Sequence, residues 1–163
     1  MSTAVVGIGS NLGDRLAHLQ LAVDALRPWL IAASPVYETA PWGPVPQPNY
    51  LNAVLLARDE AAEPREWLQR ARAAENAAGR AREQRWGPRT LDVDIVAVDD
   101  VRSDDPELML PHPKAAERAF VLVPWLAADP SARLNGLPVA DLVAALPAGE
   151  VGGVRLVPDQ RVA

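Results

Sequence analysis

One stretch decides the fold: Arg85-Trp86-Gly87-Pro88-Arg89-Thr90-Leu91-Asp92-Val93-Asp94-Ile95-Val96. Its second half alternates apolar and acidic residues, which predicts a β-strand over 91–98 whose successive side chains point to opposite faces. Asp92 and Asp94 are therefore expected on one face of this strand, and the apolar residues around them on the other. Its first half combines glycine with proline and carries arginines, which indicates a cationic loop directly before the strand.

The two aspartates have the spacing of a two-metal site. About 6.6 Å of strand separates them, so their side chains can converge on two ions about 3.5–4 Å apart, as two-metal phosphoryl transfer requires. Oxygen ligands favour Mg²⁺, and the nearby guanidinium groups match phosphate oxygens. The alternative for an isolated Asp-x-Asp is a strand with one solvated face. The clean apolar alternation and the adjacent cations favour two magnesium ions and a polyphosphate.

The composition limits the class of protein. The 163 residues are 49% hydrophobic, carry a net charge of −5 and include no cysteine. We expect a single globular domain over residues 1–163 without disulfides. The acidity argues against a nucleic-acid binder. No leader pattern and no apolar run of about 18 residues is found, so we expect a cytoplasmic protein that does not enter a membrane.

The apolar pattern along the chain predicts a β-α-β-β-α-β core. Strands are expected at 3–8, 36–39, 50–56 and 91–98, and helices at 12–30 and 64–78. Ser10 or Asn11 is expected to cap the first helix, and Pro64 and Gly79 to delimit the second. This order predicts an α/β (α+β) fold of ferredoxin-like type, an antiparallel sheet with helices packed on one face. The expected additions are an irregular stretch at 99–113, a helix at 115–127 interrupted near Pro124, a helix at 139–146 and a strand at 154–157.

Two further groups of residues can bind ligands. Tyr50 and Asn52 share a strand face after a proline-rich loop at 40–49, and an aromatic ring with an amide can hold a flat heterocycle. Stacking of a base on such a ring contributes about 1–3 kcal/mol. Phe120 is a second candidate ring, and the alternative for both rings is a place in the core. His112, between two prolines, and Arg118 are candidate phosphate contacts.

The arginine loop at 80–90 is a candidate lid. A loop of this charge could close over a bound triphosphate and exclude water, as lids do in phosphoryl-transfer enzymes. The alternative is a solvated run of charges. The residues concerned are Arg80, Arg82, Arg85, Arg89 and Trp86.

These residues, in this order, resemble the 6-hydroxymethyl-7,8-dihydropterin pyrophosphokinase family, over residues 5 to about 130. Beside the stretch at 85–94, the similar motifs are Gly9-Ser10-Asn11-Leu12, Gln47-Pro48-Asn49-Tyr50-Leu51-Asn52, Gly79-Arg80 and Pro111-His112. The resemblance implies a ferredoxin-like fold. It also implies that ATP donates its β,γ-pyrophosphoryl group to the hydroxymethyl oxygen of a reduced pterin, in folate biosynthesis, and that AMP leaves.

The resemblance also implies roles for individual residues. Two Mg²⁺ ions would be held by Asp92 and Asp94, and the catalytic residues would be Asp92, Asp94, Arg80 and Arg89. The pterin would contact Thr39, Trp42, Tyr50, Asn52 and Phe120. ATP would contact Glu75, Arg80, Trp86, Arg89, Ile95, His112 and Arg118.

Other functions remain open at this point. One is a different magnesium-dependent nucleotidyl or phosphoryl transferase on the same scaffold, which would release pyrophosphate rather than AMP. A second is an RNA-binding module that uses the sheet face and the arginine loop, which the acidic balance opposes. A third is an inactive regulatory relative, which the intact aspartate pair opposes. The expected partners are small molecules, and the protein is expected to act as a monomer.

Overall fold

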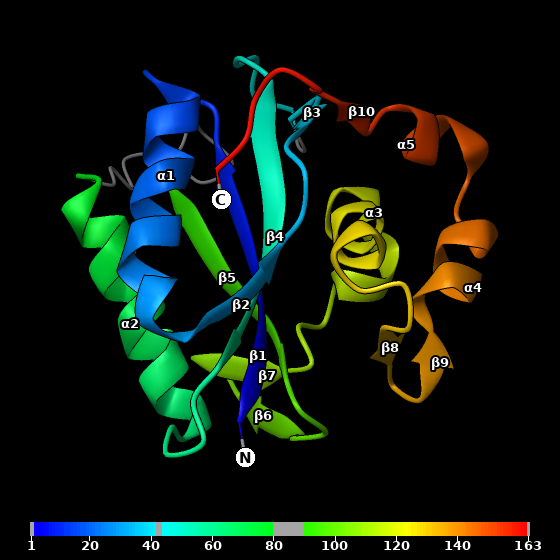
Figure 1. The fold of residues 1–163 in the computed structure, drawn as a ribbon. Helices are drawn as coiled ribbons and strands as arrows, with labels where there is room; N and C mark the ends of the chain where they lie inside the picture. Colours follow the sequence, from blue (N-terminus) through cyan, green and yellow to red (C-terminus); the bar gives the residue numbers. More distant parts are fainter. Residues whose placement is uncertain (1, 42–43, 80–89, 163) are drawn as a thin grey trace.

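A computed structural model describes residues 2–41, 44–79 and 90–162 of the chain (Figure 1). Its main sheet is antiparallel and has the strand order β10-β3-β4-β1-β5, with β2 also paired to β4. The strands are β1 (Thr3–Ser10), β2 (Leu30–Ala33), β3 (Tyr37–Thr39), β4 (Tyr50–Arg58), β5 (Asp92–Val98) and β10 (Arg155–Leu156). β1 lies between β4 and β5, which brings the residues of three strands together at the centre of the sheet.

Two helices cover one face of this sheet. They are α1 (Arg15–Leu26) and α2 (Pro64–Ala77), on the same side of the strands in Figure 1. Leu19 and Val23 of α1 and Trp67 of α2 are completely buried against the apolar face of β1, β4 and β5. The predicted ferredoxin-like order of strands and helices is therefore confirmed. As expected, α2 starts at Pro64, and it ends before Gly79, whose φ of +67° suits glycine.

The other face of the sheet carries a second core around α3. α3 (Ala119–Ala128) packs on β4, and Val54 and Val96 of the sheet meet Leu122 and Trp125 of the helix. Pro124 was expected to interrupt this helix, but α3 continues through it. The remaining elements on this side are η2 (Ala115–Glu117), β8 (Arg133–Leu134), β9 (Leu137–Pro138), α4 (Val139–Ala145) and α5 (Ala148–Gly152).

Three boundaries differ from those expected. α1 starts at Arg15, because the Asp14 carboxylate accepts the N–H of Ala17 at 3.1 Å and caps the helix, so neither Ser10 nor Asn11 does. The helix ends at Leu26, because Pro28 lies in the following turn η1 (Arg27–Trp29). The stretch 99–113 is not wholly irregular, since β6 (Ser103–Asp105) and β7 (Leu108–Leu110) form a hairpin. None of the described helices is both long enough and apolar enough to cross a bilayer.

Candidate active site

The floor of the candidate site is the central strand β1, where two glycines lie between the predicted ligand-binding groups. Gly9 is paired with Asn52 on β4 and with Asp92 on β5, and Gly7 is paired with Asp94. Directly paired residues of antiparallel strands point to the same face. The amide and the two carboxylates therefore flank a strip of β1 that has no side chains, on the face that carries α3 further along.

The two aspartates lie as the sequence predicted. Asp92 is half-buried and Asp94 is exposed, whereas Val93 and Ile95 are buried in the core with α1 and α2. Val96, one residue further on, turns to the opposite core because the pairing of β5 with β1 shifts register between Val5 and Val6. The prediction that both carboxylates share the face opposite the apolar residues is confirmed.

Two residues outside the strand hold its free edge. The buried carboxylate of Glu75, on α2, accepts the backbone N–H of Val93 at 3.0 Å. The backbone N–H of His112 donates to the carbonyl oxygen of Val96 at 2.8 Å. Both contacts fall within two residues of Asp94. They fix the strand segment that presents the carboxylates and bring His112 next to it.

The carboxylate pair suits magnesium that arrives with a polyphosphate. Among residues 2–41, 44–79 and 90–162, no group of three or more acidic, histidine or cysteine side chains could enclose a metal ion. Mg²⁺ is usually held by one or two carboxylates and completes its shell with water and substrate phosphates. Asp92 and Asp94 therefore fit a site that is completed by the substrate.

The amide of Asn52 is fixed on the other side of the glycine strip. Asn52 is only 5% exposed, and its Nδ2 donates to Thr39 Oγ1 at 2.6 Å. Its Oδ1 lies over Gly9, 2.8 Å from the place that a Cβ would occupy there. Tyr50 lies on the same face and is half-buried, as is Phe120 at the start of α3. The structure thus brings Thr39, Tyr50 and Asn52 together as predicted.

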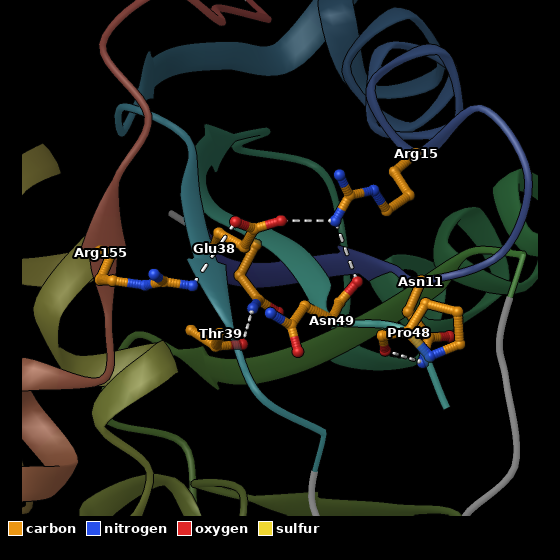
Figure 2. A network of polar contacts seen from close by, with 8 residues as sticks. Asn11, Arg15, Glu38, Thr39, Pro48, Asn49 and Arg155 are labelled. Atoms are coloured by element: carbon orange, nitrogen blue, oxygen red, sulfur yellow. Dashed lines mark hydrogen bonds and ion pairs between the residues drawn. The ribbon is translucent and has the colours of Figure 1, made fainter. Parts of the chain in front are cut away.

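A network around the first turn of α1 fixes the chain just before Tyr50 (Figure 2). Asn11 Nδ2 donates to Gln47 Oε1 at 2.7 Å and to the Pro48 carbonyl at 3.0 Å. Arg15 donates to the Asn49 carbonyl at 3.1 Å and to Glu38 at 2.8 Å. Sequence reasoning assigned no such role to Arg15 or Glu38, because neither lies in a motif. Asn11 does, and its place in Gly9-Ser10-Asn11-Leu12 was the available signal.

Cationic groups approach the site from the segment before α3. Arg118 has its Nε buried without a hydrogen-bond partner in the described part of the chain. Its guanidinium carbon lies 5.5 Å from the centre of the Phe120 ring. An unpaired buried donor is costly, so this nitrogen is a candidate contact for an anionic ligand.

His112 is neutral at pH 7 in this setting. Burial, and then the charges of Arg118 and Lys114, lower its pKa from 6.5 to about 4. Its Nδ1 accepts the backbone N–H of Lys114 at 3.2 Å, which places the proton on Nε2. His112 can therefore donate one hydrogen bond to a phosphate without adding charge.

We expect the ¹H–¹⁵N signals of His112 to titrate near pH 4. Because this pKa is lower in the folded state than the ordinary 6.5, the unfolded chain binds more protons between these values. The free energy of unfolding should therefore fall as the pH is lowered from about 6.5 to about 4. A His112→Gln variant should lose less stability over this window in urea titrations. Equal losses in both proteins would contradict the assignment.

The remaining predicted residues are placed differently. The carboxylate of Glu75 is turned to the backbone of β5, and the side chain of Ile95 is in the core, so only the backbone of Ile95 could reach a ligand. The residues predicted in the proline-rich and arginine loops lie outside the described residues. These are Trp42, Arg80, Arg82, Arg85, Trp86 and Arg89.

Comparisons with known proteins agree with this geometry. A family model described as 7,8-dihydro-6-hydroxymethylpterin-pyrophosphokinase (HPPK) matches residues 5–130. The chain is 51% identical over 169 residues to a protein of Mycobacterium bovis named 2-amino-4-hydroxy-6-hydroxymethyldihydropteridine pyrophosphokinase, and covers 90% of its length with 96% of its own. A protein of the same name from Methylorubrum extorquens is 40% identical, and the match covers 90% of this chain and 94% of that protein.

The fold is also similar to solved structures. A crystal structure of wild-type Plasmodium falciparum HPPK-DHPS matches with a TM-score of 0.65 at 13% identity. This match covers 88% of the chain described here and 44% of the Plasmodium chain. The chain thus spans less than half of that longer protein. At this identity the similarity supports the fold alone.

Proposed function

The chain belongs to the 7,8-dihydro-6-hydroxymethylpterin-pyrophosphokinase family, and we propose that it carries out the family's reaction above the glycine strip of β1. ATP donates pyrophosphate to the hydroxymethyl group of 6-hydroxymethyl-7,8-dihydropterin, giving AMP and the pterin diphosphate for folate biosynthesis. The observation that carries the proposal is the register of β1, which sets Asn52 and the aspartate pair on opposite sides of Gly9. A heterocycle bound on one side and a nucleotide tail on the other would meet above this strip.

Asp92 and Asp94 are the proposed ligands of two Mg²⁺ ions. Bound magnesium would withdraw charge from the phosphates and orient them. Asp92 reaches the strip between β1 and β5, and Asp94 lies two residues further along the same face. Glu75 and His112 hold the backbone of this segment, so the carboxylates are positioned before the nucleotide arrives.

The other residues would bind and orient the two substrates. The pterin ring would lie between Tyr50 and Phe120, with Asn52, Thr39 and Trp42 at its amide edge. The unpaired Nε of Arg118 and the Nε2 proton of His112 would donate to the triphosphate. From the sequence, we propose that the loop with Arg80, Trp86 and Arg89 closes over ATP, and that Glu75 and Ile95 lie near the nucleoside.

The reaction needs correct placement more than a strong base. The hydroxymethyl oxygen forms a bond to the β-phosphorus, the bond from that phosphorus to the oxygen bridging to the α-phosphate breaks, and AMP leaves with that oxygen. The hydroxyl proton passes to solvent. Positioning and electrostatic stabilisation supply most of the acceleration in phosphoryl transfer, which suits a rigid floor between two binding regions.

The test is an assay with ATP, Mg²⁺ and the reduced hydroxymethylpterin, followed by chromatography of the nucleotide. AMP formation that depends on the pterin is the expected result. Release of free pyrophosphate would instead show a nucleotidyl transferase. Tight RNA binding without magnesium, in the absence of AMP formation, would favour the RNA-binding alternative.

Gly9→Ala is expected to raise the KM for the pterin about tenfold, since it displaces one hydrogen-bonding amide. An added Cβ would lie 2.8 Å from Asn52 Oδ1 and 3.3 Å from Tyr50 Cδ1, so both side chains must move. Gly7→Ala is the matched control on the same strand, because its Cβ meets only Val96 at an ordinary 3.6 Å. Steady-state kinetics with each substrate varied would test this. Equal pterin KM values in both variants would contradict the role of Asn52.

The proposal extends to the state of the protein. We propose that residues 1–163 form one domain that works as a monomer in the cytoplasm on small molecules, without nucleic acid or a membrane. The support is that the Mycobacterium bovis protein is covered over 90% of its length by this single stretch. Light scattering after gel filtration should give the mass of one chain, and a dimer mass would contradict it.

A further inference from the structure

The C-terminal segment lies beyond the family match but is tied to the site. The match ends at residue 130, whereas α5 and β10 follow it. β10 pairs with β3 so that Arg155 is opposite Glu38 and Leu156 opposite Tyr37. The N–H of Val157 also donates to the Val36 carbonyl at 2.9 Å. Figure 1 shows the result, with α5 held beside the end of β3 and close to α3.

This attachment closes a cavity of about 240 Å³ that the two parts of the chain line together. One side is formed by Thr39 at the end of β3 and Phe120 at the start of α3, with their neighbours. The other side is formed by Gly149, Glu150, Gly153 and Val154. Thr39 and Phe120 are also two of the five proposed pterin contacts, so the cavity is continuous with the proposed pterin site.

We propose that residues 149–154 form the outer wall of the pterin pocket and that Gly149 sets its width. This inference rests on the proposed function, since the ligand is the pterin. The chain turns glycine toward the cavity twice on this wall, and only the side chains of Glu150 and Val154 take up space there. A side chain at Gly149 would add bulk where the ring edge is expected, next to Phe120.

The fold allows the substitution that tests this wall. A Cβ at Gly149 meets no atom within 4 Å, and the residue does not have a positive φ. Gly152, three residues on in the same helix, is equally open but does not line the cavity. Replacing glycine in a helix raises helix propensity, so neither Gly149→Leu nor Gly152→Leu should destabilise the protein.

The experiment compares the two leucine variants with wild type in the AMP assay. Gly149→Leu is expected to raise the KM for the pterin at least about fivefold and leave the KM for ATP unchanged, because the added side chain overfills the pocket. Gly149→Ala should give an intermediate KM, and Gly152→Leu should match wild type. The urea midpoints of the variants should not fall below that of wild type.

Two results would overturn the inference. One is a wild-type pterin KM in Gly149→Leu, and the other is an equal rise in the KM for both substrates or in both leucine variants. Failure of the proposed function is a different outcome, since wild type itself would then form no AMP from ATP and the pterin. Fluorescence titration of the pterin against each variant measures the same pocket without turnover and should show the same order of affinities.

Discussion

Alanine at Asp94 is expected to lower the rate of AMP formation about a thousandfold or more, while the affinity for the pterin stays near that of wild type. A loss of about 4 kcal/mol of transition-state stabilisation gives this factor, and metal-held phosphates supply several kcal/mol. Asp94 is exposed on the face above Gly7, whereas Asn52 and Tyr50 lie on the far side of β1. The substitution should therefore spare the pterin side.

Single-turnover kinetics with pterin binding measured separately would check this expectation. Asp100→Ala is a suitable control, because Asp100 is an exposed aspartate in the turn after β5. It should keep wild-type turnover and the same dependence on Mg²⁺ concentration. Wild-type-like turnover in Asp94→Ala would remove the two-metal proposal, and a large loss of pterin affinity would place Asp94 on the wrong side of the site.

Glu75→Ala is expected to destabilise the protein by about 1–3 kcal/mol and to lower kcat, because a buried N–H of the metal strand loses its acceptor. Glu75 is 5% exposed and accepts from Val93, the residue between the two aspartates. Without it, the edge of β5 is free to shift, and the carboxylates lose their fixed positions. The effect should appear in the KM for ATP and in kcat, with the KM for the pterin unchanged.

Glu75→Gln separates positioning from charge. The glutamine Oε1 can still accept the Val93 N–H, so most of the stability and turnover should return in urea denaturation and steady-state assays. Asn76→Ala, at the next and exposed position of α2, is the matched control and should resemble wild type. If alanine and glutamine at position 75 are equally inactive but stable, the carboxylate acts on the substrate and does not position β5.

Local patterns predicted those parts of the fold that depend on one segment. The alternation at 91–96 was sufficient to place Asp92 and Asp94 on one face, because side-chain direction in a strand has a period of two. Pro64 and Gly79 delimited α2 for a similar reason, since each has a backbone preference that suits one helix end. The start of α1 was missed, because Ser10, Asn11 and Asp14 are all good caps and only the length of β1 selects Asp14.

The sequence by itself determined which residue types are available and which of them share a face: the paired acids, the ring and amide at 50–52, and the ferredoxin-like order of elements. Only the tertiary structure decided that Asn52 and Asp92 lie across Gly9, that Glu75 accepts from Val93, and that residues 149–154 close the cavity beside Phe120. The physical reason is that periodicity is a property of neighbouring residues. Strand register, buried donors and cavities arise from contacts between segments far apart in the chain, and no local pattern encodes which segments meet.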